Sequence, residues 1–159
     1  MEFDKLKKIL SGNLVVPHFD SRQPVVMLTD ASRLFGLGFP LGHIEHDKDD
    51  KPILKIVHCG SKGLTPTQQR YSTIELDCLA IIWAIQKCHF YLCGLPLFRV
   101  YTDHLPLEGV FQKDIFDLVS PRLQRLREKV AMYSFRVCWV PGKTHLIADA
   151  LSCAPLFAP

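Results

Sequence analysis

Two short apolar runs of this sequence each end in the dipeptide Thr-Asp. The first covers residues 25–30 and the second covers residues 97–103. Apolar runs of this length are typical of buried strands, and a carboxylate at the end of such a strand is costly to bury unless something compensates its charge. The pattern therefore predicts two core strands that bring Asp30 and Asp103 to places where a partner, such as a metal ion, neutralises them.

The segments around these runs predict an α/β chain. Residues 36–42 and 53–59 are expected to form strands that are joined by a polar turn, and the glycines of the first are typical of a close approach to another backbone. A capping box at Thr65 and Gln68 predicts a long helix that runs to about Phe90. Further elements are expected at residues 105–110 (short helix), 120–132 (helix), 135–140 (strand) and around Asp149 (helix). Three strands followed by strand–helix crossovers predict a mixed sheet with helices on its faces.

Composition is typical of one globular domain. The chain has 159 residues, of which 48% are hydrophobic and 22% are charged. The net charge of +3 permits a polyanionic partner but does not require one. No apolar run is long enough to cross a membrane. The six cysteines form no C-x-x-C pair, and most of them lie inside apolar segments, so we expect buried thiols in a reducing compartment.

Four acids are candidates for a single site. If the two Thr-Asp strands are parallel, Asp30 and Asp103 lie at the same edge of the sheet, where ligand sites form. Glu75 stands at the head of the long helix's buried part, and Asp149 stands in the final helix. Crowded carboxylates repel one another, and divalent cations with a preference for oxygen ligands, Mg²⁺ or Mn²⁺, relieve that repulsion. Two such ions would support phosphodiester hydrolysis.

Each acid taken alone also has a structural explanation. Asp30 and Asp103 could cap the turns that follow them. Glu75 stands three residues after Ser72 and could close a capping box. Asp149 could be ordinary helix surface. The repeated Thr-Asp pattern favours a shared site, although counting carboxylates does not by itself name a reaction.

Four motifs follow one another in a fixed order along the chain. They are Thr29-Asp30-Ala31-Ser32 with Gly36-x-Gly38, Tyr71-x-x-x-Glu75-x-x-x-Leu79-Ala80-Ile81, Thr102-Asp103-His104-x-Pro106-Leu107, and Pro141-Gly142-Lys143 with Ala148-Asp149-Ala150-Leu151-Ser152. In order and spacing they closely resemble the ribonuclease H domain of gypsy-class LTR-retrotransposon reverse transcriptases. The resemblance implies the ribonuclease H-like fold, an α/β fold with a five-stranded mixed sheet, three antiparallel strands and then parallel crossovers, flanked by helices.

The resemblance also implies a domain organisation and a function. Residues 1–24 are expected to be the end of the polymerase-to-nuclease connection, residues 25–153 the ribonuclease H domain, and residues 154–159 a loose C-terminal tail. The family cleaves the RNA strand of RNA–DNA hybrids during reverse transcription and leaves a 5′-phosphate and a 3′-hydroxyl. The implied partners are the hybrid and the polymerase part of the same polyprotein, in a cytoplasmic replication particle. The oligomeric state is not predicted.

The resemblance assigns roles to individual residues. The positions that match the family's ligands for two Mg²⁺ or Mn²⁺ ions are Asp30, Glu75, Asp103 and Asp149. The expected substrate contacts are Ser32, Tyr71, Ser72, His104 and His145. Tyr71 and His104 could equally be packing or capping residues, and His145 is expected to serve helix entry rather than catalysis. The family's mobile loop histidine has no counterpart, because Gly142 or Lys143 stands in its place.

Other interpretations remain open. A stripe of basic residues between Arg122 and Lys129 could grip phosphates or could be a solvated helix face. The domain could be a non-catalytic or domesticated module that binds nucleic acid or supports a polymerase. An integrase-like nuclease of the same superfamily is a further alternative, against which the Thr-Asp-His-x-Pro-Leu and Ala-Asp-Ala-Leu-Ser segments speak.

Overall fold

The computed structural model describes residues 17–142 and 146–153. The first 16 residues of the expected connection, His145 and the expected tail at residues 154–159 lie outside these ranges. The described elements are β1 (Val25–Leu28), β2 (Asp30–Ser32), β3 (Gly36–His46), β4 (Pro52–Lys62), the 3₁₀ turn η1 (Gln68–Arg70), α2 (Thr73–Lys87), α3 (His89–Leu92), β5 (Phe98–Thr102), α4 (Pro106–Gln112), the 3₁₀ turn η2 (Ile115–Asp117), α5 (Pro121–Glu128), β6 (Phe135–Trp139) and α6 (Leu146–Ser152).

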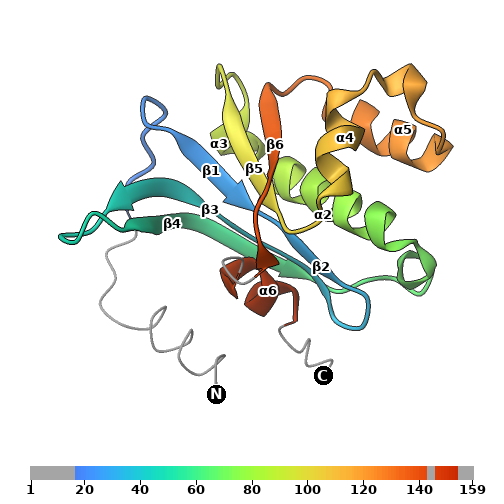
Figure 1. The fold of residues 1–159 in the computed structure, drawn as a ribbon, viewed down its shortest axis with the longest axis horizontal. Helices are drawn as coiled ribbons and strands as arrows, with labels where there is room; N and C mark the ends of the chain where they lie inside the picture. Colours follow the sequence, from blue (N-terminus) through green and yellow to red (C-terminus); the bar gives the residue numbers. More distant parts are fainter. Residues whose placement is uncertain (1–16, 143–145, 154–159) are drawn as a thin grey trace.

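The strands form one mixed sheet, as the sequence predicts (Figure 1). Its central path runs β3-β1-β5-β6, and both β2 and β4 pair with β3. The pairs β1–β3, β2–β3 and β3–β4 are antiparallel, whereas β1–β5 and β5–β6 are parallel. The described part of the chain has six strand segments rather than five, because the first predicted strand is divided at Thr29 into β1 and β2.

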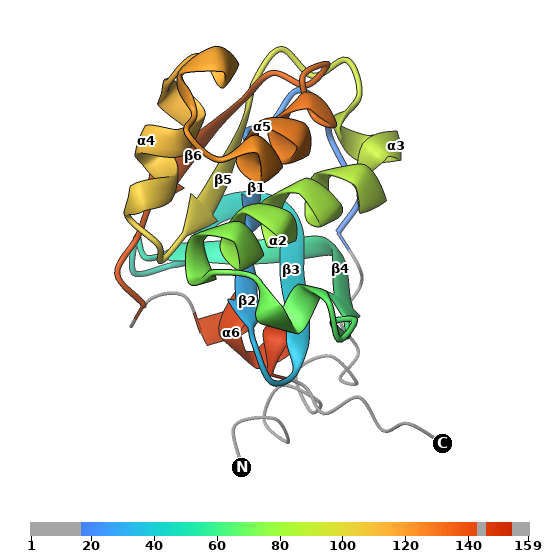
Figure 2. The same cartoon turned by 90° about the vertical axis from the view of Figure 1, so that its right-hand side faces the viewer.

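Helices cover both faces of this sheet (Figure 2). On one face, the apolar side of α2 packs on the sheet in a continuous core that includes Met27, Phe39, Ile81, Ile85 and Val100. On the other face, α6 lies against β2 and β3. Among the described residues, no helix has the length and apolar character that a membrane span requires.

The predicted long helix begins later than expected. The capping box at its start is present, because Thr65 Oγ1 accepts from Gln68 N at 3.2 Å and Gln68 Oε1 accepts from Thr65 N at 3.0 Å. It supports only the single turn η1, since the backbone becomes extended at Tyr71 and Ser72. A second capping box then starts α2 at Thr73. The expectation of one helix from Thr65 to Phe90 is therefore wrong at its N-terminal end.

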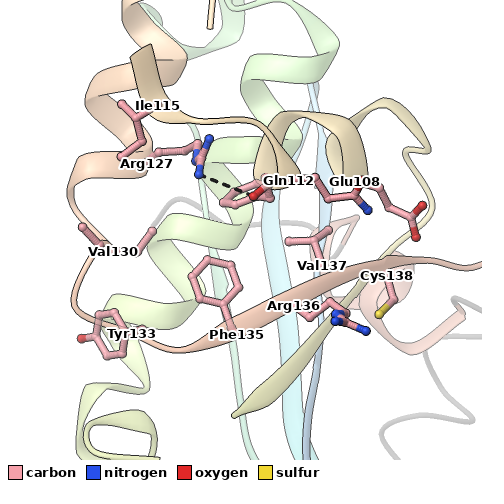
Figure 3. A pocket seen from close by; sticks show the side chains of 12 residues that line it. Glu108, Gln112, Ile115, Arg127, Val130, Tyr133, Phe135, Arg136, Val137 and Cys138 are labelled. Atoms are coloured by element: carbon pink, nitrogen blue, oxygen red, sulfur yellow. Dashed lines mark hydrogen bonds between the residues drawn. The ribbon is translucent and has the colours of Figure 1, made fainter. Parts of the chain in front are cut away.

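A cavity of about 780 Å³ lies between α4, α5 and β6 (Figure 3). Arg127 lines it and donates hydrogen bonds to the carbonyl oxygens of Val110 at 2.8 Å and Lys113 at 2.6 Å. These carbonyls belong to the end of α4, where intrahelical donors run out. Arg127 therefore joins α5 to α4. The residues that line this cavity include none of the predicted site residues.

Candidate functional site

Two predicted aspartates lie at one edge of the sheet, at the carboxyl ends of the parallel strands β1 and β5. Leu28 pairs with Tyr101, and Thr29 N donates to Tyr101 O at 3.0 Å. Asp30 and Asp103 each stand two residues beyond these paired positions. The sequence therefore predicts the shared edge correctly. On the other side of Asp103, a Cβ built on Gly142 would lie 3.5 Å from Asp103 Oδ2, so the turn after β6 approaches this carboxylate closely.

A third carboxylate, Asp77 of α2, joins this edge and was not predicted. Its exposed fraction is only 7%. Burial, together with the negative charges of Asp30 and Asp103, raises the pKa of Asp77 to about 8. The Nδ1 atom of His104 lies 3.0 Å from Asp77 Oδ2. The structure thus couples Asp77 electrostatically to both predicted aspartates.

Glu75, the predicted acid of the same helix, has different partners. Its Oε2 atom accepts hydrogen bonds from Ser72 N at 3.0 Å and from Arg122 Nη1 at 3.0 Å. Burial raises the pKa of Glu75, but the hydrogen bonds from Ser72 and Arg122 outweigh this effect and leave the pKa below its ordinary value. The structural explanation that the sequence left open, a capping box with Ser72, is the one observed.

Helix α6 carries Asp149 and connects to the acidic edge through Ser152. The Ser152 hydroxyl donates to Asp30 Oδ2. Asp149 lies one turn earlier on α6 and is exposed, and its Oδ1 atom accepts a contact from Cys153 Sγ at 3.7 Å. The structure therefore places Asp149 on the helix that binds Asp30. In the described chain, however, the Asp149 carboxylate does not act on Asp77 as the carboxylates of Asp30 and Asp103 do.

Gly38 of β3 allows α6 to approach this closely. A Cβ built on Gly38 would collide with the backbone of Leu151 and Ser152. The close backbone approach that the sequence predicts for this strand is therefore confirmed.

The substitution Gly38→Ala is expected to push α6 away from β3 and to lower the free energy of unfolding by about 2–4 kcal/mol, because overpacking here meets rigid backbone. The Ser152–Asp30 hydrogen bond should be lost with it. Chemical denaturation checks the stability. The control is Gly109→Ala in α4, where nothing lies within 4 Å of the new Cβ, and a gain of about 0.5–1 kcal/mol is expected from helix propensity. Equal effects of the two substitutions would contradict this account.

The expected substrate contacts fall into three groups. Ser32 pairs with Gly36 in the β2–β3 hairpin, so it lies near Asp30. Ser72 caps α2, and Tyr71 packs under the guanidinium of Arg122, whose Cζ lies 4.2 Å from the ring centroid. His104 contacts Asp77.

The donor set fits a divalent cation by its chemistry. All three coupled groups are carboxylates, which are ligands that Mg²⁺ and Mn²⁺ prefer. Burial and the repulsion from Asp30 and Asp103 both raise the pKa of Asp77, and a bound cation would relieve that repulsion. In the described ranges, however, no three His, Cys, Asp or Glu side chains are close enough together to form a metal site as they stand.

Comparisons with known proteins show which family the chain resembles. Residues 20–133 match the family model described as the RNase H-like domain found in reverse transcriptase. The chain is 33% identical over 153 residues to the retrovirus-related Pol polyprotein from transposon opus of Drosophila melanogaster, with 96% of this chain and 14% of that protein covered. It is 31% identical over 152 residues to the corresponding polyprotein from transposon gypsy of the same organism, with 94% and 13% covered. The chain thus spans about one seventh of the length of these relatives.

Two solved structures share the fold. RNase H1 from the halophilic archaeon Halobacterium salinarum aligns with a TM-score of 0.55 at 21% identity, over 80% of this chain and 93% of that chain. The prototype foamy virus protease–reverse transcriptase aligns with a TM-score of 0.60 at 10% identity, over 86% and 18%. At these identities the likeness shows the fold alone.

Proposed function

This chain belongs to the family of RNase H-like domains found in reverse transcriptase, and from that premise we propose that it hydrolyses the RNA strand of RNA–DNA hybrids. The observation that carries the proposal is the buried carboxylate of Asp77 on α2, whose pKa is raised by burial and by the charges of Asp30 and Asp103, which follow the carboxyl ends of β1 and β5. The RNase H-like fold is shared with a cellular RNase H1. The relatives are Pol polyproteins, which supports a polymerase part as partner within a retroelement particle.

We infer that Asp30, Asp77 and Asp103 hold the catalytic cations, with Asp149 contributing from α6. Asp77 thus replaces Glu75 in the set that the sequence suggested. Two Mg²⁺ or Mn²⁺ ions, when bound, would activate water and stabilise the leaving oxygen, which gives 5′-phosphate and 3′-hydroxyl ends.

The protein's own groups orient these ligands. Ser152 holds Asp30, His104 holds Asp77, and Trp139 Nε1 donates to the backbone oxygen of Asp103 at 3.1 Å. The contacts of Ser152 and His104 fix the direction of two carboxylates, and the Trp139 hydrogen bond fixes the backbone at Asp103. The small polar side chain of Ser32 near Asp30 suits the wide minor groove of a hybrid, where the 2′-hydroxyls mark the RNA strand.

A cleavage assay on a substrate panel tests the proposal. The RNA strand of a labelled RNA–DNA hybrid should be cut in Mg²⁺ or Mn²⁺, whereas duplex DNA and duplex RNA should stay intact. Asp103→Asn should remove the activity, because it weakens cation binding at the strand end. Hybrid binding without any turnover at high enzyme and metal concentrations would instead support a non-catalytic module.

A further inference from the structure

Arg122 is held on two sides although its side chain is 49% exposed. Its Nη1 atom donates to Glu75 Oε2 at 3.0 Å, and its guanidinium carbon lies 4.2 Å from the centroid of the Tyr71 ring. The Glu75 side chain is only 14% exposed and is itself fixed by the N-terminal capping box of α2. The three residues come from α5, α2 and the segment before α2, so the arrangement depends on the tertiary fold.

In the described chain the Glu75 carboxylate is the only hydrogen-bond acceptor of Arg122, so its other N–H donors are available to a ligand. A guanidinium has five N–H groups in a planar fork, and the contacts described here use one face and the Nη1 end. A long exposed side chain normally loses conformational entropy when it binds a ligand, and the fixed contacts have already removed that cost. Arg122 is therefore a preorganised donor for an anion with a planar or tetrahedral array of oxygens, and phosphate is such an anion.

Arg122 is connected through Glu75 to the helix that carries Asp77. Glu75 and Asp77 are two residues apart on α2, a rise of about 3 Å along the helix, and their side chains leave the helix in different directions. The other arginines of α5 are placed differently, because Arg127 is bound to backbone carbonyls of the α4 end and Arg125 is exposed to solvent. Of the basic residues of this stripe, Arg122 alone is tied by an ion pair to the helix that carries Asp77 in the described chain.

We propose that Arg122, stacked on Tyr71 and positioned by Glu75, forms a binding site for one backbone phosphate of the nucleic acid. The proposal rests on the proposed function for the identity of the ligand. Glu75 is then a positioning residue, and it acts on the substrate through Arg122 rather than as a ligand of the cations.

Hybrid binding by charge-matched variants tests this site. The probe is a fluorescein-labelled RNA–DNA hybrid, and anisotropy is read against salt concentration in the full chain carrying Asp103→Asn, which prevents turnover. Arg122→Ala should weaken binding about 5- to 10-fold and lower the salt slope by about one. Arg125→Ala removes the same charge from the same helix and should change both quantities much less. Arg122→Lys should restore the slope, because the positive charge returns.

The substitution Glu75→Gln distinguishes positioning of Arg122 by Glu75 from a simple electrostatic effect of Glu75. The two explanations predict changes of opposite sign in hybrid affinity. Glutamine keeps the capping box, so the helix start is preserved while the charge that fixes Arg122 is removed. Positioning predicts weaker binding and a higher KM with kcat unchanged. Simple electrostatics predicts tighter binding, because one negative charge near the substrate is lost. Unchanged or tighter binding by Glu75→Gln, or equal effects of Arg122→Ala and Arg125→Ala, would overturn the phosphate site.

Cleavage by the chain without Asp103→Asn separates this proposal from the proposed function. Cleavage that is indifferent to Arg122 would overturn the phosphate site and leave the nuclease function standing. Binding that depends on Arg122, in a chain that cleaves nothing, would support the phosphate site and remove the nuclease function. Circular dichroism of each variant confirms that the differences arise in folded protein.

Discussion

Asp77→Asn is expected to lower hybrid cleavage about a hundredfold or more, while Glu75→Gln keeps kcat close to that of the unsubstituted chain. The reason is the different surroundings of the two carboxylates. Asp77 is buried and coupled to Asp30 and Asp103, whereas Glu75 is bound to Ser72 and Arg122. Both substitutions replace a carboxylate with an amide of the same shape, so they differ mainly in position. Single-turnover cleavage of the labelled hybrid, at saturating protein and Mg²⁺, measures the difference.

The comparison of activities requires that both variants are folded. Asp77→Asn should remain folded, because an amide is not penalised by burial as a carboxylate is. Near-ultraviolet circular dichroism and thermal unfolding check that point before activity is compared. If Glu75→Gln lost turnover while Asp77→Asn kept it, the acid set suggested by the sequence would be restored and the set inferred from the structure would fail.

The sequence is informative about the strand ends and less so about the helix. Asp30 and Asp103 are predictable because strand pattern and parallel connection together fix which edge they share. On α2 the choice between positions 75 and 77 depends on helix phase, and the structure starts this helix at Thr73. The available signal was Asp77 itself, since an acid within the apolar section 76–85 stands at a position that is rarely charged unless it is paired or functional.

Contacts that join distant parts of the chain cannot be predicted from local sequence patterns. Arg122 and Glu75 are 47 residues apart, and Ser152 and Asp30 are 122 residues apart. Neither pair is marked by a periodic pattern in the sequence. The ion pair between Glu75 and Arg122 is therefore seen only when α5 is packed on α2. The two successive capping boxes show the same limit. Both are legible in the sequence, but only the tertiary packing of the apolar face decides which of them starts the long helix.

The raised pKa of Asp77 predicts that the metal-free protein loses stability as pH rises. Folding raises this pKa from 3.8 to about 8. Between these values the folded chain keeps a proton that the unfolded chain releases, so the contribution of Asp77 is fully present below about pH 4 and is lost as pH rises to about 8. The expected loss is on the order of a few kcal/mol, because a tenfold difference in proton affinity between the folded and unfolded chains corresponds to about 1.4 kcal/mol. Urea denaturation in EDTA at a series of pH values measures it.

The difference in the free energy of unfolding between the unsubstituted chain and Asp77→Asn isolates the effect of Asp77 from that of the other titrating groups. Glu75 acts in the opposite direction, because its lowered pKa adds stability above its ordinary range that is lost in acid. Both the unsubstituted chain and Asp77→Asn contain Glu75, so its contribution cancels in their difference. The stability advantage of Asp77→Asn should therefore grow from about pH 4 to about pH 8 and then level off. Added Mg²⁺ should stabilise the unsubstituted chain more than Asp77→Asn, and more at high pH, because the cation binds the ionised carboxylate. A difference in the free energy of unfolding that does not change with pH would contradict this prediction. It would show that Asp77 ionises as readily in the folded protein as in the unfolded chain.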